Sequence, residues 1–203
     1  MRIALVAALV AAPAPLALAH HDDRPPGEAR FAGSAHAYHQ LKAVRQDTKR
    51  FLDVREARRA GYVATGECAA SPEGGMGVHY THPGLAQDER LNIRRPEVLV
   101  YEPRGERRRL VAVEYFRADA DGRLDTDDDR PYLFGRGFDG PMEGHEPDMP
   151  VHYDLHAWVW KRNPAGTFAM WNPRVECPGA ATATATTTWA VRDDQVARRG
   201  QAA

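Results

Sequence analysis

The strongest constraint on the fold is the pattern that begins after Gly61, where short strand-like runs are separated by loops rich in Gly and Pro. Alternating, β-branched or aromatic runs of this length favour strands over helices. The runs are 76–80, 98–102, 109–116, 131–134, 151–161 and 167–171. Parallel strands need a long crossover, usually a helix, and no helix-length segment separates the later runs. The pattern therefore predicts an antiparallel sheet.

The region before Gly61 has a different periodicity, because its apolar residues recur at helical spacing over roughly 35–60. Gly61 is a suitable helix stop. The spacing predicts one long helix, or two helices with a break near 47–49. Together with the strands it predicts an α+β fold, in which a long N-terminal helix packs on a curled antiparallel sheet or partly open barrel.

The N-terminus has the features of a secretory signal peptide. Arg2 precedes an apolar run over 3–18, and residues 17–19 (Ala-Leu-Ala) fit the small-x-small pattern of a cleavage site. A transmembrane anchor is the alternative, but two prolines interrupt a run shorter than the about 20 apolar residues of a span. We therefore expect a signal peptide over 1–19 and a mature chain exported to the periplasm or extracellular space of a bacterium.

Composition divides the remaining chain into three parts. Residues 20–33 are charged and Pro-containing, which predicts a flexible lead-in. Residues 34–178 hold all the periodic segments and are expected to form a single α+β domain, an ordinary size for one core. Residues 179–203 are rich in Ala and Thr and end in an Arg-containing stretch, which predicts a disordered tail.

Charge limits the classes of partner. The 203 residues contain 27 Lys and Arg against 28 Asp and Glu, a formal net charge of -1. No basic excess is present to neutralise phosphates, so nucleic acid is not an expected partner. No second apolar run is long enough to span a bilayer, so no membrane partner is expected after signal cleavage. A small-molecule ligand is the partner class that remains.

The chain has two cysteines, Cys68 and Cys177, which are 109 positions apart. Their spacing excludes a CxxC redox or zinc motif. In an exported protein an isolated even pair favours one structural disulfide. Two unpaired buried thiols are the alternative.

The segment 151–161 carries the most informative chemistry. If it is a strand, alternation places apolar side chains on one face. The other face then carries His152, Asp154, His156, Trp158 and Trp160. Ionisable groups beside aromatic rings are typical of a pocket wall, so the two tryptophans are candidate ligand- or cofactor-binding residues. If the segment were helical, the two histidines would stack one turn apart, but its Val and Trp content favours a strand.

Three other residues are candidate metal ligands. Glu114 is a lone carboxylate among apolar neighbours in the run 109–116, where a half-buried Glu needs a partner. His79 lies in the run 76–80, and His145 lies in a loop rich in Gly and Pro. Imidazole and carboxylate together are the ligand set of Zn²⁺, Fe²⁺, Mn²⁺ or Cu²⁺.

These residues predict a divalent transition-metal site. Its candidate ligands are His79, Glu114, His145, His152, Asp154 and His156. Strand residues two apart are separated by about 6.6 Å at Cα, so Asp154 can share a metal with either neighbouring histidine. For His152 and His156 to bind the same metal, the strand would have to curve strongly. The residue of this face that does not bind the metal can instead orient the ring of a ligating histidine. A metal-free polar pocket and a structural hydrogen-bond network are alternatives.

Several strings make the domain resemble a known group of proteins. These are MGVHY (76–80), LVYEP (99–103), VEYF (113–116) and HYDLHAWVWKRNPAG (152–166). They resemble a group of uncharacterised exported bacterial proteins over roughly 40–178. The resemblance implies that these strings belong to one domain, and it implies no activity.

Two classes of function follow from the predicted site, and the sequence leaves open whether the protein is an enzyme. In a metal-dependent enzyme, a bound metal would polarise a substrate oxygen or lower the pKa of water, with Glu114 as a catalytic ligand or general base. In a non-catalytic carrier, a pocket lined by Trp158, Trp160 and histidines would hold a small ligand or a metal. No nucleotide-binding loop or GxSxG nucleophile motif is present.

Overall fold

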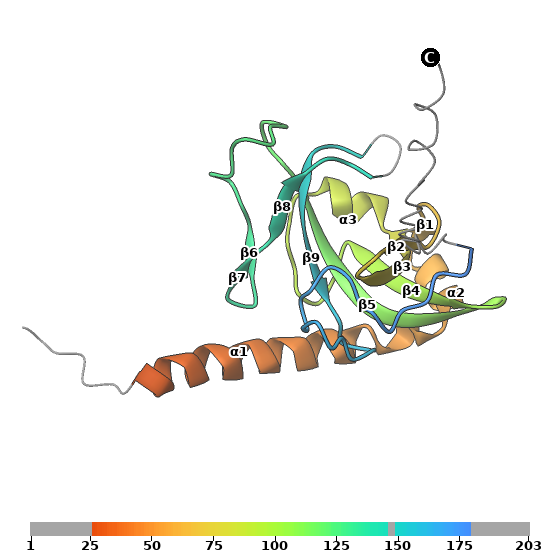
Figure 1. Cartoon of the computed structure of the whole chain (residues 1–203), viewed down its shortest axis with the longest axis horizontal. Coiled ribbons are helices and arrows are strands. Elements are labelled where there is room, and N and C mark those ends of the chain that lie inside the picture. Colours follow the sequence, from red (N-terminus) through yellow and green to blue (C-terminus); the bar gives the residue numbers. More distant parts are fainter. Residues whose placement is uncertain (1–25, 146–148, 180–203) are drawn as a thin grey trace, which may run out of the picture.

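The computed structural model describes residues 26–145 and 149–179 (Figure 1). The predicted signal peptide and almost all of the predicted tail lie outside these residues. The helices are α1 (Pro26–Asp47), the 3₁₀ helix η1 (Lys49–Leu52), α2 (Val54–Arg59) and α3 (Pro83–Gln87). The strands are β1 (Val63–Ala64), β2 (Ala69–Ser71), β3 (Gly74–Thr81), β4 (Val98–Arg104), β5 (Arg107–Ala118), β6 (Tyr132–Leu133), β7 (Arg136–Gly137), β8 (Asp139–Met142) and β9 (His152–Ala157).

The fold is mixed helix and antiparallel sheet, as predicted, and the sheet does not close into a barrel. Its strand order is β1-β3-β4-β5-β9-β8, with β2 paired to β3, and every pairing is antiparallel. Strands β4 and β5 form a hairpin, which turns at Gly105 with a positive φ of 59°. Figure 1 shows the long strands as the centre of the molecule.

The helical region is divided near 47–49, as the predicted alternative of two helices has it, and the prediction of one unbroken helix over 35–60 is not supported. α1 ends at Asp47, close to the alternative break, and η1 and α2 follow as short separate pieces. η1 is fixed to the sheet, because the Phe51 carbonyl accepts a hydrogen bond from the Tyr101 hydroxyl at 2.6 Å. α2 is capped by the Asp53 carboxylate and ends before Gly61, whose φ is 96°.

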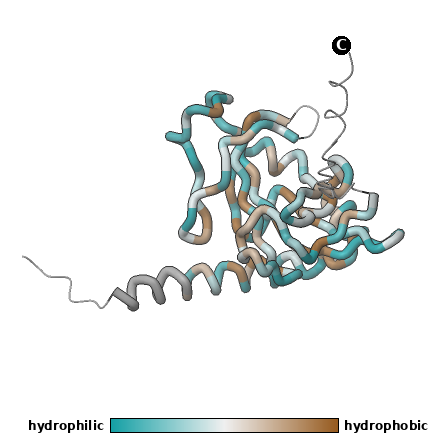
Figure 2. The backbone as a smooth tube through the Cα atoms, viewed as in Figure 1, coloured by the Kyte–Doolittle hydropathy of each residue, from teal (hydrophilic) through white to brown (hydrophobic). Residues whose placement is uncertain are grey.

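The two faces of the sheet have different surroundings. One face packs against the helices in the main core, which includes the buried residues Val44, Phe51, Tyr80, Leu99, Tyr101, Val113, Tyr115 and Leu155. The opposite face has a smaller apolar cluster that includes Val98, Val100, Ala112 and Trp158. Figure 2 shows the apolar colours concentrated on the strands and the polar colours at the outer turns. Polar side chains on the second face are therefore buried beside this smaller cluster.

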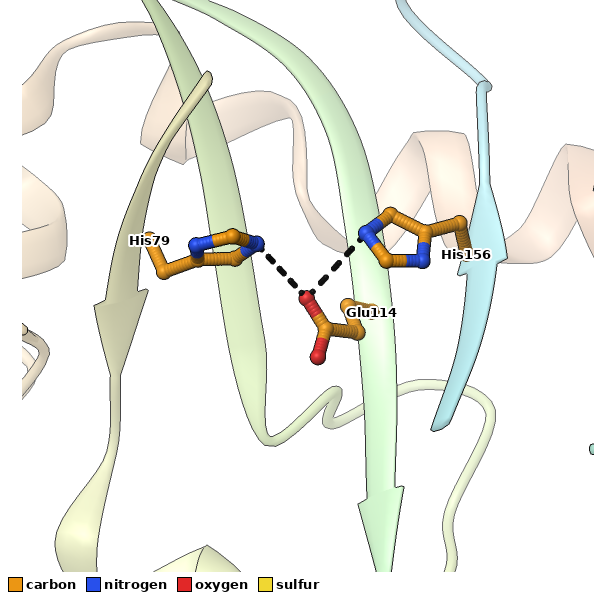
Figure 3. A group of neighbouring side chains, drawn as sticks. All are labelled: His79, Glu114 and His156. Atoms are coloured by element: carbon orange, nitrogen blue, oxygen red, sulfur yellow. Dashed lines mark ion pairs between the residues drawn. The ribbon is translucent and has the colours of Figure 1, made fainter. Parts of the chain in front are cut away.

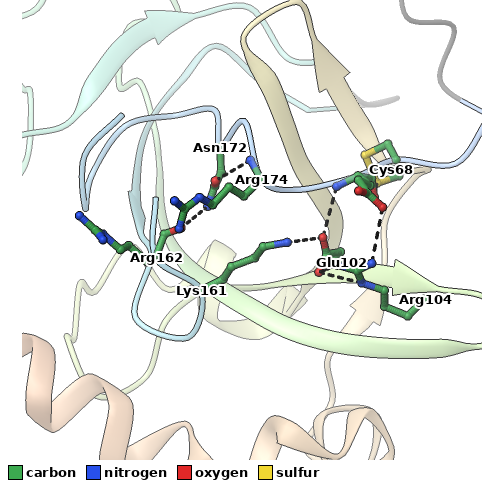
Figure 4. A network of polar contacts seen from close by, with 9 residues as sticks. Cys68, Glu102, Arg104, Lys161, Arg162, Asn172 and Arg174 are labelled. Carbon is green, nitrogen blue, oxygen red and sulfur yellow. Dashed lines mark hydrogen bonds and ion pairs between the residues drawn. A yellow bond between two sulfur atoms is a disulfide. The ribbon is translucent and has the colours of Figure 1, made fainter. Parts of the chain in front are cut away.

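The C-terminal segment covers part of the second face and is tied down at several points. The predicted disulfide joins Cys68 to Cys177 and is confirmed. Beside it, the buried Glu102 carboxylate accepts hydrogen bonds from Lys161, from Arg104 Nε at 3.2 Å and from the Glu176 amide at 3.3 Å (Figure 4). These contacts fix the segment that follows β9 over the edge of the sheet.

Three predicted strand limits need correction. β9 ends at Ala157 rather than at 161, because the chain turns there and the Trp158 amide donates to the Thr167 carbonyl at 2.9 Å. The run 167–171 forms no strand. The Gly- and Pro-rich stretch after 135 contains β7 and β8, which the sequence interpretation treated as irregular loop. Within the described parts of the chain, no helix combines the length and apolar character needed to cross a membrane.

Candidate metal centre

Strand register brings one residue from each of three strands to the same place on the second face. Glu114 on β5 pairs with His156 on β9 and, on its other side, with Val98 on β4. His79 on β3 pairs with Val100, two residues along β4 and therefore on the same face as Val98. His79 thus lies diagonally across β4 from Glu114.

The three side chains converge on one carboxylate oxygen. His79 Nε2 lies 3.1 Å from Glu114 Oε2, and His156 Nε2 lies 3.3 Å from the same oxygen (Figure 3). One ligand atom from each residue lies within 4.8 Å of the other two. Two atoms bound to one metal at about 2.0–2.1 Å and a tetrahedral angle are separated by about 3.3 Å. The two nitrogen–oxygen distances therefore match the separation of atoms bound to one metal ion.

The donors are buried and lack hydrogen-bond partners. The side chains of His79, Glu114 and His156 are 5%, 2% and 0% exposed. His79 Nε2, Glu114 Oε2 and both ring nitrogens of His156 have no hydrogen bond of good geometry. Buried polar atoms usually have hydrogen-bond partners. Several buried nitrogen and oxygen atoms that lack partners and surround one point therefore fit a bound ion. A buried His/Glu/His group of this kind can hold a metal ion.

The electrostatics of Glu114 and His156 favour an ionised carboxylate beside a protonated imidazole. Burial opposes the ionised form of Glu114, but the rings of His156 and His79 outweigh it and lower the pKa of this carboxyl. Burial likewise opposes a charged His156, but the carboxylates of Glu114 and Asp154 raise its pKa to about 9. In the metal-free protein Glu114 and His156 therefore form a buried ion pair at neutral pH.

His152 and Asp154 share the face of His156 but do not join the three-residue cluster. Both side chains are fully buried, and His152 Nε2 and both Asp154 carboxylate oxygens have no hydrogen-bond partner. Asp154 Oδ1 lies 3.8 Å from His156 Nδ1. His145 lies at the edge of the site, with its ring centroid 5.9 Å from that of His79 and 5.6 Å from that of His152. The roles of these three residues as ligands stay predictions.

The two predicted tryptophans lie in different places. Trp158 stacks on His156, with ring centroids 6.2 Å apart and planes 18° apart, and its Nε1 donates to the Ala169 carbonyl. The prediction that Trp160 shares this face is wrong, because the strand ends before it. Its ring packs on the main core, and its Nε1 donates to Thr48 Oγ1 at 3.1 Å.

A cavity of about 450 Å³ lies beside the cluster. Its lining residues are Thr65, His79, Thr81, Ala86, Gln87, Glu89, Val98, Glu114, Phe116, Ala118, His145, Met149 and Pro150. His79 and Glu114 form part of its wall, whereas His156 and both tryptophans do not line it. The role of the two tryptophans in lining a ligand pocket stays a prediction.

The sequence interpretation missed two features near the site. α3, which contributes Ala86 and Gln87 to the cavity, is too short to give a periodic signal. Glu97 is a second buried carboxylate, and burial raises its pKa to about 8. Its Oε2 accepts a hydrogen bond from the Phe116 amide at 3.3 Å. The sequence feature that could have identified Glu97 is its position directly before the apolar run of β4.

The position of Asp154 behind His156 leads to a prediction. A carboxylate behind a ligating histidine holds the ring in place, and losing it typically costs about 10–100-fold in metal affinity. We expect Asp154→Asn to lower zinc affinity by this factor in a competition titration with a chromophoric chelator. Asp125→Asn is the control, because Asp125 is exposed and pairs with Arg123 at 2.8 Å in the loop between β5 and β6. Equal affinities for both variants would show that His156 needs no carboxylate behind it.

No protein-family model, no curated protein and no solved structure matches this chain.

Proposed function

We propose that this protein is an exported, metal-dependent enzyme in which His79, Glu114 and His156 bind one divalent transition metal ion. The observation that carries the proposal is the convergence of two buried imidazole nitrogens, at 3.1 and 3.3 Å, on one buried carboxylate oxygen, with no hydrogen-bond partner of good geometry for any of the three atoms. Zn²⁺, Fe²⁺, Mn²⁺ and Cu²⁺ all accept two imidazoles and a carboxylate. The disulfide supports export, because such bridges persist in oxidising compartments.

The number of protein ligands favours catalysis over a purely structural metal. Structural zinc sites are usually closed by four protein ligands, whereas catalytic sites keep a position for water or substrate. His79 and Glu114 border the cavity, while Trp158 stacks on the far ligand, His156. The open position would therefore face the cavity.

The metal would polarise a substrate oxygen or lower the pKa of a bound water molecule. Glu114 acts in this proposal as a ligand rather than as a free base, because its Oε2 already contacts both histidines. His145 is the described cavity-lining residue with an exposed imidazole and is suited to proton transfer at the entrance. A non-catalytic carrier would use the same ligands without turnover.

Metal analysis of protein purified without an affinity tag tests the proposal. The wild-type protein is expected to contain, or to take up, one transition metal ion per chain. His156→Ala should lose most of this metal and stay folded, because the core face of β9 is untouched. His36→Ala is the control, since His36 is exposed on α1 away from the site and should retain full metal content. Absence of uptake of all four metals by the folded wild-type protein would show that the cluster is a structural ion-pair network.

A further inference from the structure

We infer that the cavity beside the proposed metal site takes a small, largely apolar ligand that coordinates the metal and carries no negative charge outside its metal-binding group. This inference rests on the proposed function, because the metal supplies the anchor for the ligand. It adds the chemical class of the molecule, which follows from the cavity wall and from the charges around the metal position.

The wall of the cavity is mostly carbon. Val98 and Phe116 form its floor on the sheet, Ala86 belongs to α3, and Met149 and Pro150 close it from the loop before β9. Thr65, Thr81 and Gln87 add neutral polar groups. A cavity of about 450 Å³ with this wall suits a compact ligand with an apolar body and few polar atoms.

Beside the imidazoles of His79 and His145, the ionisable residues of the wall are acidic. The lining contains Glu89 and Glu114, and none of its described residues is a Lys or Arg. The guanidinium of Arg117 reaches the Glu89 carbonyl at 3.2 Å, but Arg117 alternates with Phe116 and Ala118 on β5 and does not line the cavity. An anionic group on the ligand would therefore meet no Lys or Arg among the described residues of the wall.

The metal itself would not supply that missing positive charge. A divalent ion at the cluster would be neutralised by two buried carboxylates, Glu114 as a ligand and Asp154 at 3.8 Å from His156. Glu89 then leaves the cavity with an excess of negative charge. Outside the metal-binding group, a neutral or cationic ligand is favoured, and an additional carboxylate or phosphate is disfavoured.

Three catechols with the same chelating group and different side-chain charges test the inference. The probes are 4-methylcatechol, dopamine and 3,4-dihydroxyphenylacetate, titrated calorimetrically into zinc-loaded protein in oxygen-free buffer of low ionic strength. We expect the neutral and cationic probes to bind at least about tenfold more tightly than the anionic probe, as a single unscreened charge interaction allows. Equal affinity for all three probes, or no binding of any of them, would overturn the inference.

A charge placed at the cavity wall shows whether the probes bind there. Gln87 lines the cavity and is exposed, so Gln87→Lys should reduce or reverse the preference against 3,4-dihydroxyphenylacetate. Tyr38→Lys adds the same charge on the exposed surface of α1 and should leave the preference unchanged. An equal response to both substitutions would place the probes outside the cavity and overturn the inference.

Failure of the metal site and failure of the ligand class give different experimental results. If zinc does not bind, the proposed function is wrong and the inference falls with it. If zinc binds in one equivalent but the anionic probe binds as tightly as the others, the metal site stands and only the ligand class is wrong.

Discussion

Replacing Glu114 with glutamine is expected to lower metal affinity by about a hundredfold or more, the largest effect of any single change at this site. The amide keeps the shape of the side chain but removes the charge and the lone pairs that Oε2 offers to the metal. His79 and His156 would then remain as the two imidazole ligands. Competition against a chromophoric chelator measures the loss.

The same substitution has a second expected effect, on the stability of the metal-free protein. The Glu114–His156 pair is fully buried, and removing one partner of such a pair costs about 3 kcal/mol or more. Because the pKa of Glu114 is lowered, its contribution is present above its ordinary pKa and is lost as the pH falls below it. Because the pKa of His156 is raised to about 9, its contribution is present below about pH 6.5 and is lost as the pH rises to about 9.

The free energy of unfolding of the wild-type protein should therefore exceed that of Glu114→Gln most between about pH 5 and 6.5. The difference should be smaller near pH 9. Urea denaturation of chelator-treated protein across this range measures the difference in the free energy of unfolding. Glu106→Gln is a control, since Glu106 is exposed in the turn between β4 and β5 and should give no pH-dependent change. A difference that does not change between pH 6 and 9 would contradict the ion pair.

Much of the site was predictable because strand alternation is a local property. The two-residue period of β9 placed Asp154 and His156 on one face, and that of β5 placed Glu114 among apolar neighbours. Burial of both faces made these polar residues conspicuous. The same rule failed at Trp160, because alternation holds only while the chain stays in the strand. The turn after Ala157 depends on a hydrogen bond to Thr167, which periodicity does not reveal.

The arrangement of the three ligands depends on register, which a single sequence does not specify. His79 reaches Glu114 only because β3 pairs with β4 so that His79 faces Val100, while Val98 faces Glu114. A shift of one residue would turn His79 into the main core. The sequence identified His79 as a candidate ligand, but its contact with Glu114 comes from long-range strand pairing.

Removing the Cys68–Cys177 disulfide is expected to cost about 2–5 kcal/mol of folding free energy. The bridge closes a long loop, with a sequence separation of 109 residues, and cross-links of this length restrict the unfolded chain strongly. The double variant Cys68→Ser/Cys177→Ser should show this loss in urea denaturation. Wild-type protein should show it only after reduction.

The metal site should survive in the folded double variant, because other contacts hold the C-terminal segment. Gly75 and Asn172 exchange two backbone hydrogen bonds, of 3.1 and 3.0 Å, and Trp158 Nε1 donates to the Ala169 carbonyl. We expect unchanged metal content at temperatures well below the melting temperature. A loss of metal with no loss of stability would mean that the disulfide acts on the site through Trp158 instead of through the unfolded chain. Two alkylatable thiols in unreduced wild-type protein would show that the bridge does not form.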